Sequence, residues 1–476
     1  MDELPPGRSR GMKAQSEISP RPVTAYGPAL NIHLEDMPRL AAVLSLGVAI
    51  LAMTYRGTWP TPAESLTLFI SVFALYGALA LSLHLLRAVC AGFWTLMLVS
   101  FGMPVSSRTV GADFQTFYDG ARVLFDRHAS PYQAPGATAF PFPTFQLIRL
   151  LSLGGRLSSD TTFLLFVMLQ AVFLGIGFIL SCRVIKREIG DHAPELAIQL
   201  IQAGLLVHPA ILHAMGLGNS PVTAAVALIC ALWFWRCRTS RSSLHLSAIS
   251  MNLGWMVKPQ LLMATAFFPI CWWLEHRRHL SDYSRAASIG RLVVSWAAGI
   301  IFASTLMPLP ASLLAYRDFL SVAYTWHTHV AEVFTANYAL PAILAKAMAR
   351  LWGLPLSATL PFLTVGVAFS VILWNFSSLI AGKPDTVRAF LPWLLGSLLW
   401  SSIMWHFYLG LVLGGLLLMV GFLPNNPSFR ASFSMLLFCA GVGLTMIVSS
   451  FVYTLGILLL YFCCHQLRIQ ELQEKR

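Results

Sequence analysis

Apolar runs long enough to cross a lipid bilayer recur along most of this chain of 476 residues. A membrane-spanning helix needs about 20 mostly apolar residues, and fewer where it is short or re-entrant. Only 11% of the residues are charged and 57% are hydrophobic, whereas a soluble domain carries roughly 25% charged residues. This composition excludes a soluble globule, a disordered chain and a disulfide-stapled secreted module. It predicts an all-α polytopic membrane protein.

The hydropathy pattern predicts about 11–13 spans, short or broken helices included. The expected spans cover about 40–56, 66–86, 89–105, 161–182, 196–214, 219–235, 291–309, 357–380, 389–404 and 407–422, with two short spans within 433–463. A further apolar run over 246–274 is interrupted at Lys258-Pro259. Because proline prevents a regular helix from continuing, we expect two short helices that meet at a turn there, with one kinked span as the alternative.

The basic residues predict the orientation of this bundle. With the N-terminus in the cytoplasm, 22 of the 32 Lys and Arg residues fall on the inside and nine on the outside, as the positive-inside rule requires. We therefore expect a multi-pass protein of the cell membrane, with a cytoplasmic tail over 1–39, a transmembrane domain over 40–464 and a cytoplasmic tail over 465–476 that continues the last helix. The N-terminal stretch lacks the pattern of a signal peptide. The net charge of +12 then reflects topology and does not indicate nucleic acid.

Polar and ionisable groups gather on the predicted outer side. The long external loops are about 106–160 and 310–356, and turns at 216–220, at Lys258-Pro259 and at Trp405-His406 open to the same side. The internal loops mostly carry basic anchors. This convergence predicts an extracytoplasmic site between helices.

Asp113 is the candidate general base of this site. It follows the third expected span, where partial desolvation at the membrane interface would raise the pKa of its carboxyl and make it a better base. The alternative is that Asp113 caps a helix, because Phe114, Phe117 and Ala121 have helical spacing. Asp119 is expected on the solvated face of the same helix.

Five other positions carry groups suited to binding a substrate. Lys258 lies in an apolar run, so it either binds an anionic phosphate or snorkels to the interface. His327 and His329 would point the same way on an extended segment, but no third ligand supports a metal, so a phosphate contact or a proton donor is preferred. His406 either lines the site or lies at the interface, and Asn219 either binds substrate or caps a helix. The eight cysteines lack ligand spacing, and no metal or cofactor is predicted.

These segments together resemble glycosyltransferase family 87, polytopic enzymes of the GT-C fold. The resemblance covers about residues 105–410 and rests on short motifs in a shared order. The matching elements are Asp113 with Phe117 and Tyr118, Pro131-Tyr132, Phe142-Pro143-Thr144, Gly218-Asn219, Lys258-Pro259, and Ser401 or Ser402 with Trp405-His406. Two positions depart from the family pattern, since Thr144 replaces a proline and Asn219 replaces a glutamine.

The resemblance implies transfer of a sugar, typically mannose, from a polyprenyl-phosphate donor to a lipid or glycan acceptor outside the cytoplasm, with inversion and no covalent intermediate. Arabinose stays open as the sugar. Asp113 matches the catalytic base of the family. From charge and topology we expect Lys258 and His327 or His329 to stabilise the leaving phosphate, with Asn219, Tyr118 and His406 completing the substrate-binding set.

Two other functions compete with this hypothesis. A transporter or flippase for a lipid or anionic solute would show inverted repeats with paired broken helices, and only one clear break is evident. A non-catalytic membrane scaffold would leave Asp113 dispensable.

Overall fold

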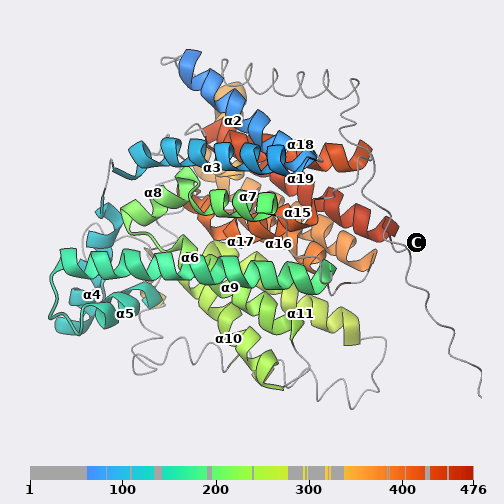
Figure 1. The fold of residues 1–476 in the computed structure, drawn as a ribbon. Helices are drawn as coiled ribbons and strands as arrows, with labels where there is room; N and C mark the ends of the chain where they lie inside the picture. Colours follow the sequence, from blue (N-terminus) through green and yellow to red (C-terminus); the bar gives the residue numbers. More distant parts are fainter. Residues whose placement is uncertain are drawn as a thin grey trace, which may run out of the picture.

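The fold is a bundle of α-helices (Figure 1). The structure, a computed structural model, describes residues 62–81, 83–107, 110–132, 142–189, 196–237, 241–276, 293–294, 297, 317–319, 321–322, 337–382, 384, 386–401, 404–423, 429–446 and 450–474. Within these ranges the regular structure is helical and contains no strand. The predicted all-α class is therefore confirmed.

The helices of the first half run in chain order from α2 to α11. They are α2 (Pro62–Ala80), α3 (His84–Ser107), α4 (Ala112–Asp126), α5 (Phe142–Leu151), α6 (Ser159–Ile189), α7 (Leu196–Leu206), α8 (Pro209–Leu217), α9 (Pro221–Arg236), α10 (Arg241–Val257), the 3-10 helix η1 (Pro259–Leu261) and α11 (Leu262–His276). The helices of the second half are α14 (Leu340–Trp352), α15 (Leu356–Ile380), α16 (Val387–Leu399), the 3-10 helix η2 (His406–Val412), α17 (Leu413–Phe422), α18 (Phe429–Thr445) and α19 (Ser450–Glu474).

The main core is built on the helices that are apolar on every side. Nearly all residues of α16 and α17 are buried, which is the pattern of helices surrounded by other helices. An aromatic cluster joins α11 to α16, because the rings of Phe267 and Phe390 lie 5.2 Å apart and those of Phe268 and Phe390 lie 5.5 Å apart. A second, smaller core lies between α4, α5 and α6 and contains Phe114 and Phe145.

In the part of the chain that the structure describes, four helical stretches are long and apolar enough to cross a membrane, namely Ser159–Glu188, Leu196–Leu217, Leu356–Ile380 and Phe451–Gln473. Two of them, in α6 and α15, bury only 17% of their most apolar window inside the protein. Large apolar side chains such as Val172 and Phe369 are exposed there, at 58% and 61%. An apolar helix with an apolar exposed surface fits a lipid environment, so these helices indicate association with a membrane. The full span count and the orientation stay predictions.

The expected break at Lys258-Pro259 is confirmed. Helix α10 ends at Val257, and η1 begins at Pro259 and leads into α11. The backbone of Lys258 is extended, with φ −141° and ψ 98°, as expected for a residue before proline.

The expected span over 196–214 differs from the structure. This run is divided into α7 and α8, because His208 caps α8 through its Nδ1, which accepts a hydrogen bond from the backbone N–H of Ala210 at 3.1 Å, and Pro209 is the first helical residue. The stretch from 465 onward continues the last helix as expected, and up to Glu474 it forms the last turns of α19. The expected tail over 1–39, the span over 40–56 and most of the span over 291–309 lie outside the described residues.

Candidate functional site

The start of α4 is docked on the turn between α8 and α9. The backbone N–H of Gly111 donates to the carbonyl oxygen of Gly216 at 2.8 Å. Gly111 and Gly218 both have positive φ, 71° and 75°, which suits glycine. A Cβ at Gly218 would overlap with Phe114. These two glycines therefore allow the first turn of α4 to approach the turn that carries Asn219.

Asp113 and Asn219 meet at this junction. The Nδ2 of Asn219 donates to the Oδ2 of Asp113 at 2.6 Å, although the two residues are 106 positions apart. Asp113 lies in the first turn of α4, whose N-cap is Gly111, and α9 has Ser220 as its N-cap. Neither residue is thus the N-cap of its helix. The contact places an ionisable carboxylate against a fixed amide donor.

Asn219 is held in place by Gln170 of α6. The Nε2 of Gln170 donates to the carbonyl oxygen of Asn219 at 2.9 Å, and the hydroxyl of Thr223 donates to the Oε1 of Gln170 at 3.3 Å. The Oδ1 of Asn219 accepts the backbone N–H of Ser220 at 2.8 Å. With its backbone and its side chain both engaged, Asn219 presents its amide to Asp113 in one orientation.

Lys258 brings a buried positive charge to the same place. Its side chain is only 3% exposed, and its charge acts on the carboxylate of Asp113. Among the described residues its Nζ has no hydrogen-bond or ion-pair partner. The closest described interaction of the ammonium is with the ring of Tyr408, whose centroid lies 5.3 Å from Nζ. A buried ammonium of this kind favours an anionic ligand.

Tyr408 belongs to η2, the 3-10 helix between α16 and α17, and is 7% exposed. The side chain of Gln260 of η1, just past the Lys258-Pro259 break, acts on the hydroxyl of Tyr408. The carbonyl oxygen of Gln260 in turn accepts from the indole N–H of Trp400 at 3.1 Å. The broken segment and η2 are therefore joined side by side around Lys258. The candidate site combines α4, the α8–α9 turn, the α10–η1 break and η2.

Burial raises the pKa of the Asp113 carboxyl above its ordinary value, as the sequence predicted. The hydrogen bond from Asn219 and the positive charge of Lys258 lower it again in part. Asp113 lies on α4, outside the membrane-spanning stretches. A half-buried carboxyl with a raised pKa is a stronger base than a solvated aspartate once it is ionised.

Of the other predicted site residues, the structure describes Tyr118 and the backbone of His406. The hydroxyl of Tyr118 donates to the carbonyl oxygen of Leu157 at 2.7 Å and its ring is buried beside Phe114, so it packs within the smaller core. Its role in substrate binding stays a prediction. The backbone of His406 begins η2, two residues before Tyr408. His327 and His329 lie outside the described residues. No group of histidine, cysteine or acidic side chains suited to a metal occurs in the part of the chain that the structure describes.

Three residues near the site were missed by the sequence reasoning: Tyr408, Gln260 and Gln170. Gln170 carried a signal, because an uncharged amide inside an apolar run usually faces the protein interior and finds a partner there. Tyr408 and Gln260 each lie two residues after a predicted site residue. Nothing local to them indicates that they meet.

Comparisons of the chain with known protein families, with curated proteins and with solved structures found no match. The described residues define an all-α protein with apolar helices of membrane length and a polar site between α4, the α8–α9 turn, the α10–η1 break and η2. The resemblance to glycosyltransferase family 87 rests on the short motifs alone.

Proposed function

We propose that the chain is an integral membrane glycosyltransferase that uses a polyprenyl-phosphate sugar, most simply the mannose donor, on the extracytoplasmic side of a multi-pass bundle with both termini in the cytoplasm. The observation that carries the proposal is the meeting of Asp113, Asn219 and Lys258 in one site. Such a transfer makes the attacking hydroxyl acidic and releases an anionic phosphate. A base can take the proton of the hydroxyl, and a buried cation can stabilise the phosphate. The surrounding apolar helices suit a donor with an isoprenoid tail.

The reaction would proceed in one displacement. The Asp113 carboxylate takes the proton of the acceptor hydroxyl while that oxygen bonds to the anomeric carbon. The bond from this carbon to the phosphate oxygen breaks, and polyprenyl phosphate leaves with the electron pair. The configuration at the anomeric carbon inverts, because attack and departure occur on opposite faces.

The chain offers groups for both ends of this step. Asn219 orients the carboxylate of Asp113 through its 2.6 Å hydrogen bond. Lys258 would stabilise the negative charge on the leaving phosphate, since its ammonium makes no direct ion pair within the described part of the chain. His327 or His329 would add a donor to the phosphate, and His406 would line the site.

The test is an assay of purified protein with radiolabelled polyprenyl-phosphate mannose and total membrane lipid as acceptor. Asp113→Asn should lower transfer about 10²- to 10⁴-fold, the usual contribution of a general base. Asp119→Asn is the matched control, because Asp119 is exposed on the same helix and only accepts from Gln115 at 3.1 Å. Wild-type transfer by Asp113→Asn would remove Asp113 as the base. An absence of transfer by the wild type, with movement of lipid or solute across proteoliposomes, would favour the transporter.

A further inference from the structure

A pocket lined by apolar side chains and two arginines lies at the far end of α4, away from Asp113. It has a volume of about 530 Å³ and is formed by the end of α4, by α5 and by the turn that follows α5. The side chains that line it include Phe125, Gln146, Arg149, Leu150, Leu153 and Arg156. Because Phe125 is twelve residues after Asp113, it lies roughly 18 Å farther along the helix axis. We call this cavity the α4–α5 pocket.

The α4–α5 pocket carries a surplus of positive charge. Asp126 accepts from Arg149, whose Nη1 lies 2.6 Å from Oδ1, and it also faces Arg122, whose Nε lies 3.7 Å from Oδ2. The guanidinium of Arg156 makes no ion pair or hydrogen bond with another described residue. The lining residues thus include two arginines, Arg149 and Arg156, and no carboxylate, and only Arg149 is paired with Asp126. The pocket therefore favours an anion.

The buried end of the pocket contains a donor without a partner. Gln146 is 3% exposed, and its Nε2 makes no hydrogen bond in the described part of the chain. A buried amide that stays unsatisfied is unfavourable. An acceptor at this end of the pocket would relieve that penalty.

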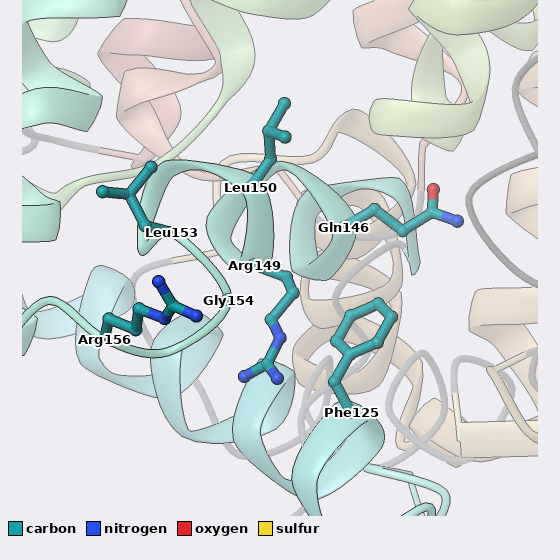
Figure 2. A pocket seen from close by; sticks show the side chains of 7 residues that line it. All are labelled: Phe125, Gln146, Arg149, Leu150, Leu153, Gly154 and Arg156. Carbon is teal, nitrogen blue, oxygen red and sulfur yellow. The ribbon is translucent and has the colours of Figure 1, made fainter.

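The outer edge of the pocket is apolar. Leu150 and Leu153 are 65% and 63% exposed. Figure 2 shows their side chains projecting from one side of α5, while the guanidinium of Arg149 extends toward α4 on the other side. The turn after α5 leads within a few residues into α6, whose exposed surface is apolar. In Figure 1, α4 and α5 lie beside the end of the bundle where α6 begins.

We propose that the α4–α5 pocket binds the phosphate head group of an anionic membrane lipid. Arg156, with Arg149 beside it, pairs with the phosphate, and Gln146 supplies a hydrogen bond. Leu150 and Leu153 contact the start of the acyl chains, because the pocket lies at the end of a lipid-exposed helix. The proposal does not depend on sugar transfer at Asp113.

The experiment is native mass spectrometry of the detergent-purified full chain, titrated with phosphatidylglycerol, with phosphatidylcholine or with inorganic phosphate. Phosphatidylglycerol should bind more tightly than the other two. Arg156→Gln should weaken its binding about fivefold, the effect expected of one basic residue at a lipid surface. Arg122→Gln is the matched control, since Arg122 is 60% exposed and does not line the pocket.

A second variant separates a ligand role of Gln146 from a structural one. Gln146→Leu should weaken phosphatidylglycerol binding without lowering the thermal stability of the lipid-free protein, because the amide has no partner to lose. Unchanged affinity in Arg156→Gln or in Gln146→Leu would overturn the proposal, as would an equal loss in Arg122→Gln. Inorganic phosphate binding as tightly as the lipid would also overturn it and would indicate a site for a small anion.

Discussion

Lys258 and Arg468 are both buried cations, with exposed fractions of 3% and 1%, yet their surroundings differ. The Nη1 of Arg468 donates to Glu471 at 2.6 Å and to Thr386 at 2.9 Å, and the hydroxyl of Thr386 donates to the same Glu471 oxygen at 3.0 Å. The ammonium of Lys258 contacts a ring and acts on Asp113 without a direct ion pair in the described residues.

This difference is the one expected between a structural cation, Arg468, and the binding cation that the proposed function makes of Lys258. Thr386 also caps α16 by accepting from the backbone N–H of Ala389 at 3.1 Å, so the Arg468 cluster joins the end of α19 to the start of α16. Its charges are matched inside the protein. The charge of Lys258 is matched only in part, and this is the state expected of a group that awaits an anionic substrate.

The largest expected effect is the loss of stability in Arg468→Met. This change leaves the carboxylate of Glu471 buried without its cation, and breaking a buried pair costs about 3–5 kcal/mol. Thermal and denaturant unfolding in detergent measure the loss. Sugar transfer per folded molecule should stay at the wild-type level. Arg183→Met, at an exposed position on α6, is the control, and equal stability of the two variants would contradict the structural role.

Lys258→Met should show the opposite behaviour. Loss of a hydrogen bond to a charged group costs about 1.5–3 kcal/mol, so kcat/KM for the polyprenyl-phosphate donor should fall roughly 10- to 100-fold. Stability should not fall, because a buried ammonium without a direct partner is itself unfavourable. Lys346→Met on α14 makes the same chemical change away from the site. Unchanged donor kinetics in Lys258→Met would contradict the phosphate role.

A smaller effect is expected for Asn219→Ala. The substitution removes the donor that orients Asp113, a hydrogen bond that contributes about 1–1.5 kcal/mol, so transfer should slow roughly fivefold to tenfold. Initial rates at saturating donor measure this change. Thr223→Val alters the next layer of the network, through Gln170, and should have a weaker effect. A larger loss in Thr223→Val than in Asn219→Ala would show that the contacts act through packing.

The smallest expected effect is a shift in the pH dependence of transfer, which should differ between variants at the site and Arg468→Met. Asp113 must be ionised to act as a base, so activity should fall as the pH drops through its pKa, which burial raises above the ordinary 3.8. Asn219 and Lys258 each lower this pKa, and therefore Asn219→Ala and Lys258→Met should both move the acidic limb of kcat/KM to higher pH. Arg468→Met should leave the limb where it is. An acidic limb that none of these variants moves would not belong to Asp113.

The local parts of this architecture were predictable from the sequence. Proline at position 259 interrupts the helix that ends at Val257, and the apolar runs mark most of the helices. The break before Pro209 has the same signal, a proline. It was not predicted, because the apolar run over 196–214 continues across it. The 3-10 helix η2 replaces the first part of the expected span over 407–422. Hydropathy did not reveal this difference, because these 3-10 turns are as apolar as an α-helix would be.

The assembly of the site was predictable only in part. Asp113, Asn219 and Lys258 stood out because each is polar at an expected helix end. Tyr408 and Gln170 did not, since their importance comes from partners far away in the chain. The packing of Tyr118 in the smaller core was not predicted from its motif either. Contacts between residues so far apart in the sequence depend on how the helices pack, and the local sequence pattern does not specify that packing.

In the proposed reaction the phosphate of the sugar donor binds at Lys258, with the sugar toward Asp113. An experimental structure of the Asp113→Asn variant with intact donor bound is the most direct test. A phosphate oxygen should lie within about 3 Å of the Nζ of Lys258, and the anomeric carbon should lie on the side of position 113. A donor phosphate held elsewhere, with Lys258 still against the ring of Tyr408 and out of reach, would contradict it.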